Sequence, residues 1–125
     1  RLGFHPGFGL SLTLPRLIGA QRAATLLYTG RRIGGEEAVA MGLADELVEK
    51  EQVLARSMAL AQDIAASAPL AVASTRAGLR EGLAQQVAEA NRRELAIQRQ
   101  QFRTEDFREG VAAMAQRRTP VFHGR

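Results

Sequence analysis

The chain has 125 residues, a formal net charge of +4 and no cysteine, which excludes disulfides and thiolate metal sites. Its length allows one modest domain with a buried core. No apolar run reaches the roughly 18 to 20 residues that cross a bilayer, and no signal-peptide pattern is present. We therefore expect no membrane partner and a location in the cytoplasm.

Basic residues are concentrated at the start of the chain, where the first 35 residues hold five arginines and no acid. Such a cluster favours an anionic partner, either nucleic acid or the phosphates of a nucleotide. Solvated helix faces in an arginine-rich protein are the plainer interpretation. Nucleic-acid binding also calls for stacking aromatics or a groove-reading helix, yet Tyr28 is the single tyrosine and tryptophan is absent. We expect no nucleic-acid partner.

The first ten residues, RLGFHPGFGL, combine a predicted strand end over Arg1–Phe4 with a loop at Pro6-Gly7-Phe8-Gly9. A glycine-rich loop that enters a helix exposes backbone N–H groups, which can hold an anion or a polarised water. The alternative is a tight turn between a strand and a helix.

Neither histidine has the surroundings of a catalyst. No acid or nucleophile lies near His5 in the sequence, and His123 belongs to the terminal tail. A lone histidine is seldom catalytic, so we assign neither residue a role.

Most of the remaining chain has the apolar spacing of helices. We expect one or two helices over residues 11–28, broken around Gly19, and a short helix between Gly34 as N-cap and Gly42 as its end. Leu43–Val48 is then predicted to form a brief strand. Three further helices are predicted over residues 51–66, over 69–83 and after residue 83, followed by a last helix that begins at the cap Thr104 and is ended by Pro120.

These last four helices carry few large apolar residues for a bundle that packs only on itself. Many alanine faces indicate that the helices lie against another part of the protein or another subunit.

Three separated motifs resemble the crotonase superfamily of enoyl-CoA hydratases and isomerases, in that family's order. The first is Leu2-Gly3 followed by the Pro6–Gly9 loop, with Arg16-Leu17-Ile18-Gly19 after it. The second is TGRRIGGEEAVAMGLADELV over residues 29–48, and the third is DFREGVAAMAQRRTPVFHG over residues 106–124. Leu10 stands where the family has a second glycine, and Phe8 where it often has alanine.

The resemblance covers the C-terminal portion of the family and implies an α/β fold for the parent protein, the crotonase ββα spiral. This fragment is then expected to be mostly α-helical with one or two short strands. Residues 1–50 would form the end of the spiral core, and residues 51–125 a helical region for trimerisation and CoA contact. A homotrimer or a dimer of trimers is implied.

The resemblance also implies a set of site residues. The Pro6, Gly7, Phe8 and Gly9 loop would lie beside the acyl pocket, with the Gly7 amide holding the reacting water. Arg117 stands where the family contacts the phosphates of CoA, which enters as part of an acyl-CoA substrate; no bound cofactor and no metal are expected. Alternatively, Arg117 and its neighbour only satisfy the dipole of a helix C-terminus.

Crotonase hydration uses two carboxylates and two oxyanion-hole amides, and in the family these precede the position of Arg1. We therefore expect no catalytic residue in this chain apart from Gly7, and a fragment that is catalytically incomplete. The sequence does not separate hydratase, isomerase, hydrolase and lyase. A helical oligomerisation module without a ligand, or a basic nucleotide- or nucleic-acid-binding domain, remain the alternatives.

Overall fold

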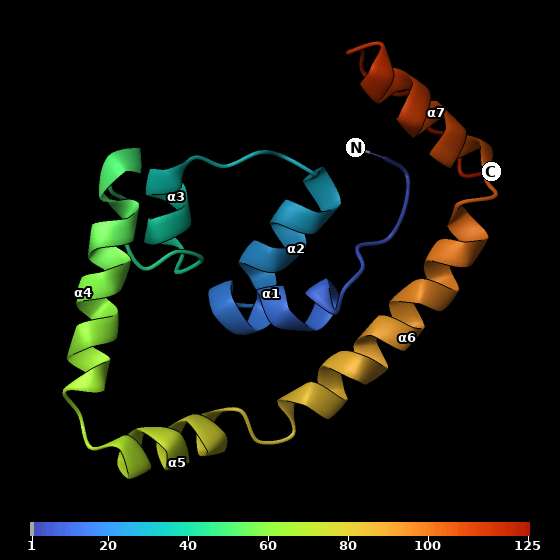
Figure 1. Ribbon diagram of the computed structural model, residues 1–125. Helices are drawn as coiled ribbons and strands as arrows, with labels where there is room; N and C mark the ends of the chain where they lie inside the picture. The colour runs from blue at the N-terminus through green and yellow to red at the C-terminus, as the bar shows by residue number, and fades with distance from the viewer. Residues whose placement is uncertain (1) are drawn as a thin grey trace. The chain divides into compact units, whose positions relative to one another are not determined.

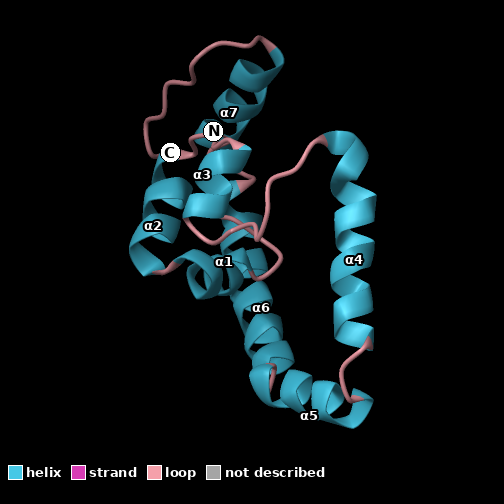
Figure 2. Ribbon diagram, turned by 90° about the vertical axis from the view of Figure 1, so that its left-hand side faces the viewer, coloured by secondary structure: helices cyan, strands magenta, loops and turns pink. Residues whose placement is uncertain are grey.

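The computed structural model describes residues 2–125, and the helices of this part of the chain are shown in Figure 1. Between the helices run turns and loops (Figure 2). The elements in chain order are α1 (Leu10–Ile18), α2 (Ala20–Thr29), α3 (Gly35–Ala40), the 3₁₀ helix η1 (Lys50–Gln52), α4 (Val53–Ala65), α5 (Pro69–Leu79), α6 (Leu83–Gln101) and α7 (Glu105–Ala115).

The two predicted strands are wrong, because residues 2–125 contain no strand. A strand requires a neighbour whose N–H and C=O groups complete a ladder. In Leu43–Val48 the first two N–H groups instead donate to the carbonyl of Ala38 and finish α3. The N-terminal stretch is bonded by side chains of α6, and Arg1 lies outside the described residues. The expected fold class of helices with one or two short strands is corrected to helices and loops.

Helix boundaries that depend on local residues are confirmed. Gly19 separates α1 from α2, and Gly34 is the N-cap of α3. Thr104 is the N-cap of α7, and its hydroxyl accepts a hydrogen bond from the N–H of Phe107 at 3.1 Å. The predicted end of the last helix at Pro120 is wrong, because α7 ends at Ala115.

The chain divides into two compact units, Arg1–Ile33 with Gln85–Arg125, and Gly34–Ala84. We call them the loop unit and the hairpin unit. The hairpin unit holds α3, η1, α4 and α5, and nearly all of its side chains are intermediate or exposed. That residues 1–50 form the end of a spiral core and residues 51–125 a region for trimerisation and CoA contact stays a prediction.

In the loop unit, the N-terminal segment packs on α6 and α7. Phe4 meets Phe102 and Phe107 in an aromatic cluster, with ring centroids 4.8 to 5.8 Å apart. A Cβ on Gly110 would lie 2.6 Å from the backbone of Leu2, so only glycine admits this approach. The segment is thereby fixed before it reaches the glycine-rich loop.

The C-terminal tail runs back along α7 (Figure 2). The carboxylate of Asp106 accepts hydrogen bonds from the N–H groups of His123 and Gly124, at 2.7 and 2.8 Å. Glu109 accepts another from the N–H of Val121 at 2.9 Å. Across residues 2–125, no helix combines the length and apolar character needed to cross a membrane.

Candidate functional site

The segment that leads into the Pro6–Gly9 loop is bonded to α6 by side-chain amides. The N–H of His5 donates to Gln101 Oε1 at 2.6 Å, and Gln98 Nε2 donates to the carbonyl of His5 at 2.8 Å. The imidazole of His5 contacts the carbonyl of Pro6 through Nδ1 at 2.7 Å. This ring is engaged with the backbone of the loop, and the absence of a catalytic role for His5 stays a prediction.

The loop itself holds two successive residues in the left-handed region. Phe8 has φ 61° and Gly9 has φ 76°, and the first of these is costly for a residue with a side chain. The Phe8 side chain is 94% exposed. Among residues 2–125 no acceptor receives a hydrogen bond from the N–H groups of Gly7 or Phe8. The loop therefore has two backbone donors without an acceptor in residues 2–125, and one exposed aromatic ring.

Glu94 of α6 holds the other side of the loop. Its carboxylate accepts hydrogen bonds from the N–H of Gly9 at 2.7 Å, the N–H of Ser11 at 2.9 Å and the hydroxyl of Ser11 at 2.5 Å. The residue is 0% exposed. Helix α1 has no side-chain cap and no acid in its first turn, so Glu94 supplies both from a distant helix.

The environment of Glu94 favours its ionised form. Burial by itself raises the pKa of a carboxyl group, but the hydrogen bonds from Ser11 and Gly9 outweigh it, so the pKa of Glu94 lies below its ordinary value. The nearby His5 lowers it slightly further.

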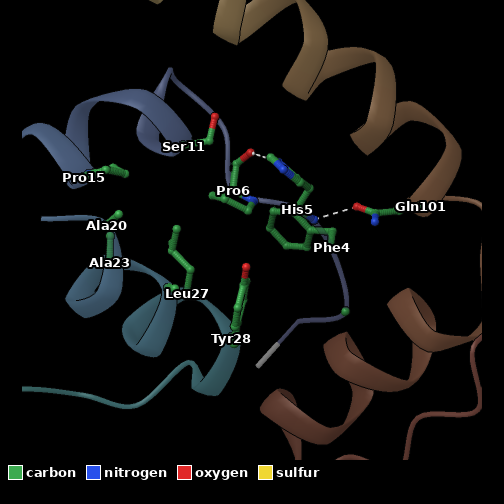
Figure 3. A pocket seen from close by; sticks show the side chains of 12 residues that line it. Phe4, His5, Pro6, Ser11, Pro15, Ala20, Ala23, Leu27, Tyr28 and Gln101 are labelled. Atoms are coloured by element: carbon green, nitrogen blue, oxygen red, sulfur yellow. Dashed lines mark hydrogen bonds between the residues drawn. The ribbon is translucent and has the colours of Figure 1, made fainter.

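A cavity of about 490 Å³ adjoins the loop, which is in the range of small-molecule pockets. Figure 3 shows its wall, with Pro6 on one side and the side chains of Leu27 and Tyr28 on the other. Ser11 and Gln101, two residues that hold the loop segment, also line it. The wall is mainly apolar, which suits an acyl chain better than a charged ligand.

The two arginines after α7 have different surroundings. Arg118 forms a bidentate pair with Glu109, at 2.5 and 2.6 Å. Arg117 is exposed, and within residues 2–125 no side-chain hydrogen bond or ion pair engages it. It also has φ 54°, because the N–H of Arg117 bonds Met114 O and the N–H of Arg118 bonds Ala113 O in a Schellman helix end. An arginine occupies the position where glycine is usual.

The structure brings together only part of the predicted site. Pro6, Gly7, Phe8 and Gly9 form one loop, and Pro6 also lines the cavity. No hydrogen bond or ion pair within residues 2–125 joins Arg117 to that loop. Whether these residues bind a substrate stays a prediction.

The predicted site residues did not include Glu94, Gln98 and Gln101. A signal was nevertheless present, since Glu94 and Gln98 are four residues apart on a helix face that also contains the buried Ala90. Polar residues on a buried face need partners, and here the partners are the backbone groups of the loop.

The family comparison is decisive, because the enoyl-CoA hydratase/isomerase family model matches residues 1–125. The chain belongs to the enoyl-CoA hydratase/isomerase family. The crotonase resemblance of the three sequence motifs is thereby confirmed.

Relatives within this family show how much of a member the chain represents. The human enoyl-CoA hydratase domain-containing protein 2, mitochondrial, is 36% identical over 127 residues, which cover 98% of this chain and 44% of that protein. An enoyl-CoA hydratase/isomerase structure from Pseudoalteromonas atlantica T6c superposes with a TM-score of 0.84 at 30% identity, covering 98% of this chain and 49% of that one. A carnitinyl-CoA dehydratase structure from Mycobacterium avium 104 has a TM-score of 0.85 at 29% identity, covering 99% and 50%. The chain thus spans about half the length of these relatives.

Members of the enoyl-CoA hydratase/isomerase family act on CoA thioesters. Residues 2–125 of this member contain no group of three or more histidines or carboxylates that could hold a metal ion.

Proposed function

We propose that the full-length protein acts on acyl-CoA thioesters, as a hydratase of 2-enoyl-CoA substrates or an isomerase of 3-enoyl-CoA substrates. One observation carries this proposal: the Gly7 amide, which has no acceptor within residues 2–125, lies in a strained loop beside an apolar cavity, in a member of the enoyl-CoA hydratase/isomerase family. A hydratase adds water across an activated double bond, so it must hold that water beside the acyl chain.

In this proposal the Gly7 N–H donates to the reacting water. Because this donor has no protein acceptor within residues 2–125, it is available for a ligand. A fixed backbone donor is already oriented, so it does not have to reorganise when the charge changes during reaction. The exposed Phe8 ring would contact the acyl group and narrow the range of substrates.

The acid–base carboxylates would come from outside these 125 residues, so this chain alone would be catalytically incomplete. The supporting observation is Glu94, the carboxylate bonded to the loop. Both its oxygens are engaged by donors and it is fully buried, so it cannot take a proton from water.

Arg117 would contact the phosphates of CoA. Its exposure and lack of a partner within residues 2–125 support this role, whereas Arg118 is committed to Glu109. Guanidinium groups bind phosphate oxygens through two parallel N–H donors.

The hairpin unit would form subunit contacts in a homotrimer or a dimer of trimers. Leu54, Met58 and Ile64 of α4, with Leu70 and Leu79 of α5, are each at least half exposed. A groove of about 420 Å³ runs beside Ile64 and Leu79. Apolar surfaces of this kind mark interaction sites. We also propose that the protein is located in the cytoplasm.

The test is a direct assay of the full-length protein for hydration of 2-enoyl-CoA thioesters and isomerisation of 3-enoyl-CoA thioesters of several acyl lengths. Turnover of either class supports the proposal. A stable oligomer with neither turnover nor CoA-thioester binding would instead indicate an oligomerisation module without a ligand.

The role of Arg117 is tested by comparing Arg117→Ala with Arg118→Ala, on CoA thioesters and on pantetheine thioesters that lack the nucleotide phosphates. Arg117→Ala should raise KM for CoA thioesters only. The control Arg118→Ala breaks the pair with Glu109 and should affect both substrate classes equally. Equal losses with Arg117→Ala would contradict phosphate binding.

A further inference from the structure

Glu94 is a buried carboxylate that the proposed reaction does not use. It is 0% exposed, and each of its oxygens faces donors from the loop entering α1: Oε2 receives the Gly9 N–H, and Oε1 receives the N–H and hydroxyl of Ser11. A buried ionised group is expensive unless it is fully bonded. Its placement therefore calls for an explanation beyond packing.

The strained residue of the loop lies directly beside one of these bonds. Phe8, at φ 61°, precedes Gly9, whose N–H is bonded to Glu94. A non-glycine residue in this region keeps its conformation only when its surroundings over-determine it. Gln98 holds the other side through the carbonyl of His5, so Phe8 is held from both sides along the chain.

The same bonds determine which N–H groups of the loop are engaged. Glu94 engages Gly9 and Ser11, while Gly7 and Phe8 have no acceptor within residues 2–125. If the Gly9 bond were lost, the peptide planes before it could rotate, and the direction of the Gly7 N–H would change with them.

We infer that Glu94 is a positioning residue that holds the Pro6–Gly9 loop so that the Gly7 N–H faces the substrate. This inference rests on the proposed function. It differs from a purely structural role in what it requires of catalysis: a structural carboxylate affects stability alone, whereas a positioning carboxylate affects the rate of a folded enzyme.

The test is Glu94→Gln in the full-length protein, which keeps the shape of the side chain. Gln retains one acceptor oxygen and places an NH₂ group against either Gly9 or Ser11, where two donors then meet. Misplacing a catalytic group by about 1 Å costs up to ~100-fold in rate, so we expect kcat to fall roughly 10- to 100-fold with little change in KM.

The matched control is Ile18→Ala, at a buried position of α1 that lies outside the cavity wall. It removes core contacts and lowers the melting temperature at least as much. Measured well below both melting temperatures, Ile18→Ala should keep the wild-type kcat.

A second readout does not depend on activity. Amide hydrogen exchange should accelerate at Gly9 and Ser11 in Glu94→Gln, and remain protected at Phe107, whose acceptor is Thr104. Wild-type kcat in Glu94→Gln, or equal losses of kcat in both variants, would overturn the positioning role. Absence of turnover in the wild-type protein would count against the proposed function instead, so the two failures are distinguishable.

Discussion

Helices α1 and α7 of the loop unit begin in opposite ways. Helix α7 is capped by the residue before it, Thr104, and carries two acids in its first turn. Helix α1 has neither, and its first turn is bonded to Glu94, 83 to 85 residues further along the chain. Both solutions satisfy N–H groups that have no partner within the helix.

The two arrangements have different consequences for the chain that precedes each helix. A local cap stabilises its own helix and leaves the preceding chain free to vary. A distant cap also bonds the preceding loop to another helix, so the position of the Pro6–Gly9 loop depends on α6. Substitutions at the two helix starts should therefore differ in their effects on stability and on catalysis.

Removing the distant cap should be the most damaging change. Glu94→Ala leaves the buried donors of Gly9 and Ser11 without an acceptor and opens a cavity, so we expect the free energy of unfolding to fall by roughly 3–5 kcal/mol. Urea denaturation of the full-length protein measures it. A loss below that of Thr104→Ala would contradict the distant cap.

Gly9→Ala tests the same place, where the Pro6–Gly9 loop enters α1, by a change in the loop. A Cβ on Gly9 would lie 2.9 Å from Val87 Cγ1 in a left-handed backbone with φ 76°, so stability should fall by roughly 2–3 kcal/mol. Thermal unfolding checks this, with Gly34→Ala as control because nothing lies within 4 Å of a Cβ there. Similar losses of stability in both variants would show that the contact of Gly9 with Val87 does not restrict this position to glycine.

Thr104→Ala should have a smaller effect. It removes one hydrogen bond to Phe107, and N-cap losses cost about 1 kcal/mol. The kinetics of the enzyme should stay unchanged, since the loop does not depend on this cap. A large fall in kcat without further unfolding would contradict the separation of the two helix starts.

Arg117→Gly should stabilise the protein while weakening its function. Glycine takes the left-handed position at the end of α7 without steric cost, so stability should rise by roughly 0.5–1 kcal/mol. KM for CoA thioesters should rise at the same time. A loss of stability would indicate that Arg117 has a structural partner in the full-length protein.

The tail along α7 supplies a pH test. Hydrogen bonding from Arg118 and then from the N–H of Val121 lowers the pKa of Glu109 to about 2, from an ordinary value of 4.5. Because the folded-state pKa is depressed, the stabilisation is complete above pH 4.5 and is lost as the pH falls towards 2. The protection factor of the Val121 amide, taken against the intrinsic exchange rate at each pH, should be kept at pH 4 and fall near pH 2, and in Glu109→Ala it should be low at both. A protection factor that already falls at pH 5 would contradict the pairing.

Features with local causes could be predicted from the sequence. Gly19, Gly34 and Thr104 act through their own backbone neighbours, and the helix breaks and caps were confirmed. The strand over Leu43–Val48 was wrong because pairing depends on a partner that no local pattern specifies. Pro120 was wrong because α7 ends earlier, at the Schellman turn of Arg117.

The same distinction between local and distant causes applies to the residues of the candidate site. The glycine-rich loop could be predicted from the sequence because its residues are adjacent, although its role stays a prediction. Glu94 was not predicted as a site residue, because its partners Gly9 and Ser11 lie far away in the sequence.

The role of the Gly7 N–H is tested most directly by NMR of the full-length protein, labelled with ¹⁵N-glycine, during titration with butyryl-CoA, a saturated thioester that cannot be hydrated. We expect a large shift of the Gly7 resonance as ligand binds, and a small one for Gly9, whose N–H is already bonded to Glu94. Binding of butyryl-CoA with an unmoved Gly7 resonance would contradict a role of the Gly7 N–H in the site.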